Sequence, residues 1–382
     1  MKNNRKVLYI AGFLFSINIA LTSYVTSSFL NVFINEKYLG IIYAISAILT
    51  IWGLFEIPKI MSKYGNTNTS IFSSILSFIS LIVLSFGNNA YFIVPAFIMY
   101  FITSNFLIMN FDIFIEELSP SKHIGKSRGI YLLVINGAWV LAQLVSGSII
   151  AKSSYQGIFL FSASLIILTT GMFILFFQKF KDPIYKKISI LKNLRFFIKQ
   201  KNIFRIYMLN FLLKFFFAWM VIYTPIYLHE YILFSWDKIG IIFTVMLLPF
   251  VILDYPMGKL SDKIGEKKML ILSFTLTAIF VLMIPLIKNN SLFVWAGILF
   301  FTRVGAAIIE IMSESYFFKA VNVDNSEAIS FFRNTGPMSY LIAPIIATII
   351  LATTPSFKYI FYILTLIMLL GTLISLRLKE IK

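Results

Sequence analysis

The chain has 382 residues, of which 59% are hydrophobic, 13% are charged and 41 are phenylalanine. A soluble domain of this length has too little interior to bury so much apolar surface, so the composition excludes a soluble globular protein. The sequence contains no cysteine, which excludes disulfides and thiolate metal sites, and its net charge of +17 raises the question of an acidic partner.

Twelve long apolar segments follow one another along the chain. We expect them near residues 7–33, 38–57, 69–87, 90–117, 129–151, 155–178, 203–228, 236–257, 269–287, 291–318, 328–352 and 356–376. About 20 apolar residues span the hydrocarbon core as a helix, and lipid offers the backbone no hydrogen-bond partner outside a helix or closed barrel. Continuous runs such as TLTAIFVLMIPLI lack the alternation of a barrel strand. We therefore predict an all-α polytopic membrane protein with twelve transmembrane helices.

The first apolar segment follows a basic start, MKNNRK, as the apolar region of a signal peptide would. Its apolar run continues for roughly 25 residues, which is longer than that region usually is, and it lacks a good cleavage site of the A-x-A type. We expect a first membrane helix that is retained in the protein.

The basic residues lie mostly on one side of the predicted membrane. With the N-terminus inside, the inner segments hold 25 lysines and arginines and the outer segments hold five. This asymmetry is typical of membrane proteins whose basic loops face the cytoplasm. We therefore predict a multi-pass protein of the cytoplasmic membrane, with both termini in the cytoplasm and its basic loops attracted to an anionic inner leaflet. Because the charge indicates orientation, we expect no nucleic-acid partner.

The widest inner segment divides the chain into halves. We predict an N-terminal six-helix bundle over 1–178, a basic cytoplasmic linker over 179–202 and a C-terminal six-helix bundle over 203–382. Apolar residues recur at helical spacing through the linker, with lysines on the other side; they are Ile184, Ile188, Leu191, Leu194 and Ile198. This pattern favours an amphipathic helix on the inner leaflet, and a flexible tether is the alternative.

The two halves look like copies of each other. Polar and glycine residues of the first half recur about 200 positions later, which is typical of transporters built from two parallel repeats. The matched pairs are Gly65 with Gly265, Asn105 with Arg303, Asp112 with Glu310, Glu116 with Glu314, and Gly137 with Gly336. We therefore expect two pseudo-symmetric bundles.

One loop resembles a known family signature. Residues 258–268 read GKLSDKIGEKK, which resembles the inner-loop motif of the major facilitator superfamily, where it lies between the second and third helices and again between the eighth and ninth. The first copy, PKIMSKYGNTN at 58–68, is degraded because Ser62 replaces the acid and Pro58 the glycine. The resemblance implies two bundles around a central cavity and the transport of a small-molecule solute.

The resemblance also implies a latch at the inner face, formed while the two halves are closed on that side. It would place Asp262 against the start of the eleventh helix, near Arg333 and with Glu314 close by. An acid is stabilised at a helix N-terminus, and an arginine adds charge-assisted hydrogen bonds. The alternative is a solvated turn whose charges only set topology. The latch residues are Gly258, Asp262, Lys263, Gly265, Glu314 and Arg333.

Four ionisable residues lie deep within the predicted spans: Asp112, Lys214, Arg303 and Glu310. An unpaired charge in the bilayer costs roughly 2.5–3.5 kcal/mol on insertion scales, so such residues often serve a site. They fall on the fourth, seventh and tenth helices, which line the cavity in the resembled family. Arg303 and Glu310 are seven positions apart and share one helix face. We predict that Glu310, or else its repeat counterpart Asp112, carries a coupling proton.

Uncharged groups on the fourth and seventh helices, and Asn18 on the first, complete the predicted site. They could add hydrogen bonds and ring stacking for a solute, and packing is the alternative for each of them. These residues are Asn18, Asn105, Asn210, Trp219 and Tyr223.

The leading hypothesis is a secondary active transporter, acting as a monomer, that moves a small-molecule solute by alternating access and is coupled to protons. The sequence has no P-loop, GxGxxG, HExxH or Ser-His-Asp pattern, so we predict no enzymatic activity, no cofactor and no metal site. A transporter-like sensor or assembly factor without flux is the alternative from another class. Within the transporter class, a drug exporter and a nutrient importer both remain open.

Overall fold

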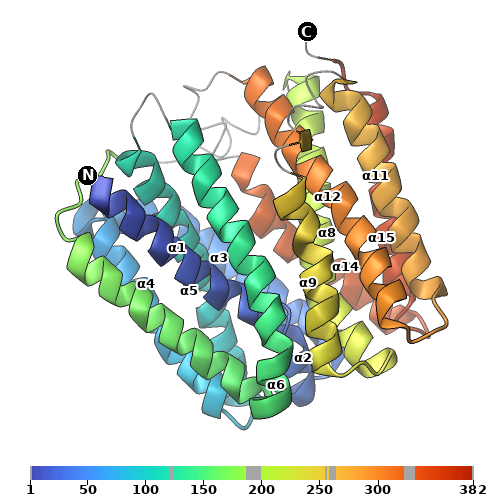
Figure 1. The fold of residues 1–382 in the computed structure, drawn as a ribbon, viewed down its shortest axis with the longest axis horizontal. Coiled ribbons are helices and arrows are strands. Elements are labelled where there is room, and N and C mark those ends of the chain that lie inside the picture. The colour runs from blue at the N-terminus through green and yellow to red at the C-terminus, as the bar shows by residue number, and fades with distance from the viewer. Residues whose placement is uncertain are drawn as a thin grey trace. The chain divides into compact units, whose positions relative to one another are not determined.

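The computed structural model describes residues 2–119, 124–185, 199–253, 256–257, 264–321 and 332–380. In this part of the chain the regular structure is helical (Figure 1). The chain forms two compact units, one of Met1–Lys187 with Ser235–Gly240 and one of Ile188–Phe234 with Ile241–Lys382.

Long helices account for almost all of the first half of the chain. They are α1 (Lys2–Ser23), α2 (Thr26–Phe33), α3 (Glu36–Tyr64), α4 (Asn66–Phe86), α5 (Ala90–Leu118) and α6 (Ile124–Phe176). Helix α6 consists of two helices in direct succession, because Ser154 interrupts it with φ 56° and ψ −166°. The fifth and sixth predicted spans therefore meet at this residue.

The second half repeats this pattern. Its helices are α8 (Lys201–Ile226), η2 (Tyr227–Tyr231), α9 (Trp236–Ile252), α11 (Glu266–Met283), η3 (Ile284–Leu286), α12 (Leu292–Ala320), α14 (Thr335–Thr353) and α15 (Tyr359–Leu376). Among the described residues, ten helices are long and apolar enough to cross a membrane. With α6 counted as two helices and the 17-residue α9 added, the prediction of twelve membrane helices is confirmed.

The first predicted span, 7–33, is broken at Tyr24 and Val25 between α1 and α2. Hydroxyl groups near the break donate to backbone carbonyl oxygens four residues earlier: Thr22 Oγ1 to Asn18 at 3.1 Å within α1, and Thr26 Oγ1 to Thr22 at 2.7 Å across the break. Such back-bonding competes with the backbone ladder and bends helices. A run of threonine and serine therefore divides one apolar segment into two helices.

The two halves use the same helix pairings. Helix α4 packs on α5 and α6 in the first unit, and α11 packs on α12 and α15 in the second. Gly65 and Gly265 stand directly before α4 and α11 with φ of 84° and 87°. This region of backbone conformation is almost restricted to glycine, so both glycines are needed for the turn that starts these helices.

Candidate functional site

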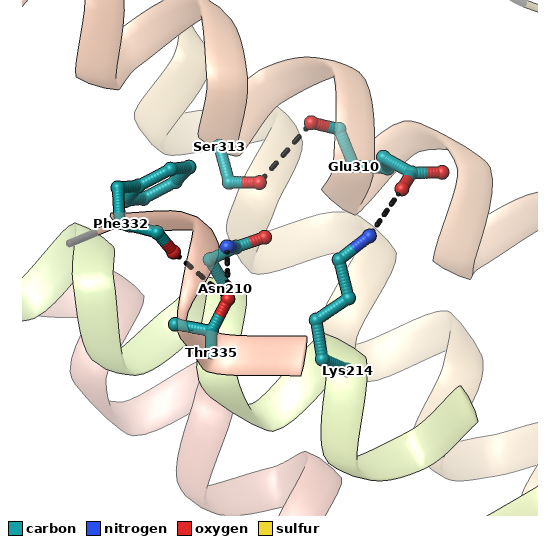
Figure 2. A network of polar contacts seen from close by, with 6 residues as sticks. All are labelled: Asn210, Lys214, Glu310, Ser313, Phe332 and Thr335. Carbon is teal, nitrogen blue, oxygen red and sulfur yellow. Dashed lines mark hydrogen bonds and ion pairs between the residues drawn. The ribbon is translucent and has the colours of Figure 1, made fainter. Parts of the chain in front are cut away.

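Two oppositely charged side chains on different helices meet in the second unit (Figure 2). Lys214 Nζ of α8 lies 2.6 Å from Glu310 Oε1 of α12. The two side chains are 30% and 31% exposed, so each is mostly buried but keeps part of its surface accessible. The ion pair joins two long apolar helices. A single unpaired charge in such a helix would be costly in the bilayer.

The strength of this ion pair depends on whether Glu310 carries a proton. While Glu310 is ionised, the ammonium of Lys214 holds it by charge and hydrogen bonding. Once the carboxylate is protonated, the charge attraction is lost and the link between α8 and α12 is weakened to a hydrogen bond with a neutral acceptor. A proton can therefore change the interaction between two helices that carry the pair.

Arg303 lies two turns before Glu310 on α12 and is almost fully buried, at 1% exposure. Its guanidinium carbon lies 4.8 Å from the ring centre of Phe216 and 5.5 Å from that of Phe217. Lys214 Nζ lies 5.2 Å from the same Phe217 ring. One aromatic ring of α8 thus contacts two cations, and such contacts stabilise positive charge in apolar surroundings.

A short chain of hydrogen bonds joins α8 to the start of α14 beside the ion pair (Figure 2). Asn210 Nδ2 donates to Thr335 Oγ1 at 2.8 Å, and Thr335 Oγ1 donates to the Phe332 carbonyl at 2.9 Å. Ser313 Oγ donates to the backbone carbonyl of Glu310 at 3.1 Å. Asn210 is buried and lies one turn before Lys214 on α8. Its hydrogen bond to Thr335 links α8 to α14.

Trp219 and Tyr223 of α8 are fully buried. The Trp219 ring lies 5.1 Å from Phe215 and 5.9 Å from Tyr223 between ring centres. The Tyr223 hydroxyl points to the carbonyl of Pro344 on α14 at 3.4 Å. In this structure both side chains contribute to helix packing.

The first unit holds an uncharged polar cluster between α1 and α5. The Tyr100 hydroxyl donates to Asn18 Oδ1 at 3.0 Å and lies 2.8 Å from Thr22 Oγ1. All three residues are buried. Asn18 was among the residues predicted for the site, whereas Tyr100 and, in the second unit, Phe217 were not. Aromatic residues are so frequent in the spans that no pattern marked these two.

The other predicted residues of α5 are less enclosed. Asn105 Nδ2 donates to the Phe101 carbonyl of its own helix at 2.8 Å. Asp112 is half-buried, as is Asn105. Glu310, the other predicted coupling carboxylate, forms a close ion pair with Lys214 of another helix.

Three of the six predicted latch residues, Gly258, Asp262 and Lys263, lie outside the described residues. Gly265 is described and precedes α11. Glu314 on α12 and Arg333 before α14 are both exposed. The latch therefore stays a prediction. Within the described residues, no group of three or more His, Asp or Glu side chains is placed to hold a metal ion.

Comparisons with known proteins place this geometry in a family. The model of the Major Facilitator Superfamily matches residues 8–238 and 225–381. The nucleoside permease NupG of Escherichia coli (strain K12) and that of Shigella flexneri are each 24% identical to this chain over 176 residues. The match spans 41% of this chain and 41% of the length of these curated relatives.

Two solved structures share the fold over nearly the whole chain. The crystal structure of a mutant of the nucleoside transporter NupG matches with a TM-score of 0.78 and 13% identity, covering 98% of this chain and 99% of that one. A bacterial metal transporter matches with a TM-score of 0.69 and 14% identity, covering 98% of both chains. At these identities the likeness shows the fold alone. With the family match across both halves and twelve membrane helices, the chain belongs to the Major Facilitator Superfamily and is a multi-pass membrane protein.

Proposed function

We propose that the protein is a secondary active transporter in which a proton on Glu310 is coupled to the movement of solute by alternating access. The observation that carries the proposal is the contact of 2.6 Å between Lys214 and Glu310, which joins α8 to α12 inside membrane-spanning segments. Protonation of Glu310 breaks this ion pair and frees the Lys214 ammonium. The free energy of the proton is thereby converted into a change of contact between helices.

The coupling needs a proton affinity that differs between the outward-open and inward-open states. Desolvation disfavours an ionised carboxylate, while a nearby cation favours it. If the distance between Glu310 and Lys214 differs between the states, the proton affinity of Glu310 differs too. A tenfold difference corresponds to about 1.4 kcal/mol, so a modest rearrangement is enough to load a proton on one side and release it on the other.

Nucleosides are the solute class to test first. The sequence likeness to a nucleoside permease over 176 residues supports this choice. A nucleoside is uncharged, so a proton must enter through a group of the protein, which fits an ionisable pair at the site. Lys214 offers ammonium donors, and Phe217 next to it offers a ring face against which a base can stack.

The experiment is solute flux into proteoliposomes that contain the purified protein. We expect uridine and adenosine to accumulate above the outside concentration under an inward proton gradient, and a protonophore to abolish the accumulation. Protein-free liposomes are the control, and a sugar, a lipophilic cation and Mn²⁺ form the comparison panel. Flux of uridine without accumulation would refute proton coupling. An absence of flux for every solute would favour the sensor or assembly-factor hypothesis.

A second expected result concerns orientation in the cytoplasmic membrane. The chain has no cysteine, so single cysteines can be introduced at Lys192, in the predicted cytoplasmic linker, and at Asn289, in the exposed turn before α12. A membrane-impermeant thiol reagent added to intact cells should label position 289 and spare position 192. Both positions should react after the cells are opened. The reverse pattern in intact cells would overturn the predicted orientation.

A further inference from the structure

The segment after the sixth membrane helix folds back onto the start of α4. The backbone N–H of Asn66, the first residue of α4, donates to Asp182 Oδ1 at 2.6 Å. One residue further on, Thr67 Oγ1 donates to the carbonyl of Phe177 at 2.8 Å. The Tyr185 hydroxyl also donates to Asp182 Oδ1. Two hydrogen bonds thus join residues 177–185 to the helix start, and the third, within this segment, ties Tyr185 to Asp182.

Helix α4 needs such an acceptor from elsewhere in the chain. The first N–H groups of a helix have no partner within it, and that end carries a partial positive charge. The residue before α4 is Gly65, which has no side chain to cap it, and the first turn of the helix contains no acid. Asp182 supplies both the missing acceptor and the missing negative charge. Burial raises the pKa of the Tyr185 phenol, which keeps this group protonated as a donor to Asp182.

The second unit places a carboxylate in the corresponding position. Glu380 Oε1 lies 3.8 Å from the point that a Cβ on Gly265 would occupy, directly before α11. The Tyr316 hydroxyl fixes this segment by donating to the carbonyl of Lys379 at 2.6 Å. Asp182 in KFKD and Glu380 in RLKE are 198 positions apart, the same offset that relates α5 residues to α12 residues. Each acid follows the last helix of its half.

We infer that Asp182 caps the start of α4, the helix that follows the first inner-loop motif, and that Glu380 is its repeat counterpart before α11. Asp182 is distinct from the acid that the first motif lacks, because the second half carries both Glu380 and Asp262. Asp182 touches neither the ion pair of the proposed coupling site nor a solute group, so it is a positioning residue. It fixes the start of α4 and the point at which the linker leaves the first unit.

The test compares four variants of the full-length protein. Asp182→Ala removes the acceptor and the charge, Asp182→Asn keeps an acceptor, and Asp182→Glu keeps the carboxylate found at position 380. Lys181→Gln is the matched control, because Lys181 is the exposed neighbour. Hydrogen–deuterium exchange of peptides covering residues 66–69 measures the helix start directly and needs no solute. We expect faster exchange, by about two- to thirty-fold, in Asp182→Ala, a smaller rise in Asp182→Asn, and native exchange in Asp182→Glu and Lys181→Gln.

Gly65→Ala provides a second route to the same junction. A Cβ at position 65 would lie 2.8 Å from Asp182 Oδ2, whereas for a Cβ at position 265 the nearest atom among the described residues is Glu380 Oε1 at 3.8 Å. Both substitutions strain a backbone of positive φ, so Gly265→Ala is the control for strain alone. We expect Gly65→Ala to raise exchange at its own helix start more than Gly265→Ala does at residues 266–269. Equal effects would contradict a contact with Asp182.

The functional readout is uridine uptake, separated into maximal rate and KM. We expect Asp182→Ala to lower the maximal rate by about two- to thirty-fold with KM unchanged, because the residue acts on helix position and not on the solute, and Asp182→Glu to restore the rate. Native exchange in Asp182→Ala would overturn the inference. Faster exchange with an unchanged maximal rate would overturn the positioning role. Because hydrogen exchange requires no solute, a failure of the proposed nucleoside activity leaves the inference testable.

Discussion

Replacing Glu310 with glutamine is expected to abolish proton-driven accumulation of solute while leaving passive exchange of the same solute in place. Glutamine keeps the shape and can still accept a hydrogen bond from Lys214, whose Nζ lies 2.6 Å from Glu310 Oε1 in the native protein. It cannot take up or release a proton in the working pH range. The measurement is uphill uptake under a proton gradient, set against counterflow of labelled solute without a gradient.

Three variants separate coupling from the structural role of the ion pair. Glu230→Gln is the matched control, because Glu230 is an exposed carboxylate of η2 that lies outside the proposed site and the latch. Lys214→Gln leaves Glu310 without its partner and should cost about 1–3 kcal/mol of stability. The charge exchange Lys214→Glu with Glu310→Lys restores a pair and should recover stability more than coupling. If Glu310→Gln still concentrates solute under a proton gradient, Glu310 does not carry the proton, and Asp112, sodium coupling or uniport becomes the better account.

The second large effect is expected on folding, at Gly305 of α12. A Cβ at this position would collide with Thr277 Oγ1 and would lie 2.7 Å from the Ser273 carbonyl oxygen, both on α11. The backbone carbonyl cannot move without shifting α11, so Gly305→Ala should force the two helices apart. Overpacking of this kind costs typically about 1–3 kcal/mol. We expect a lower melting temperature and a lower yield of folded protein in detergent.

Gly297 on the same helix is the matched control for Gly305. A Cβ at position 297 would meet no atom of the described part of the chain within 4 Å. Alanine is favoured over glycine in a helix by roughly 0.5–1 kcal/mol, so Gly297→Ala should be neutral or slightly stabilising. If both variants melt at the same temperature, the close approach of α11 and α12 at Gly305 does not limit stability.

The fold class could be predicted from the sequence because an apolar segment in the bilayer must satisfy its backbone hydrogen bonds internally. Segments such as 69–87 and 90–117 have to be helices, and the structure has α4 at Asn66–Phe86 and α5 at Ala90–Leu118. The first span was less predictable. Its length indicated one helix, but hydroxyl groups such as those of Thr22 and Thr26 bond to backbone carbonyls and divide it. This competition depends on side-chain geometry that hydropathy does not record.

The site could be predicted from the sequence only in part. The cost of charge in lipid was enough to select Lys214, Arg303 and Glu310 as unusual residues. Arg303 and Glu310 are seven residues apart and therefore share one helix face. In the structure, however, Glu310 forms its close ion pair with Lys214, and Arg303 lies against Phe216. Spacing along a helix states which residues share a face. It does not state which helix packs against that face.

By itself the sequence determined that the chain is a twelve-helix membrane protein with a repeated architecture, because these properties follow from hydropathy, length and an offset of about 200 residues. Only the tertiary structure decided that Asp182 lies at the start of α4 and Glu310 beside Lys214. Each of these contacts joins residues about 100 positions apart, through the packing of helices. Local patterns determine single elements, whereas the partners of a charged or capping group depend on where the rest of the chain brings its own polar atoms.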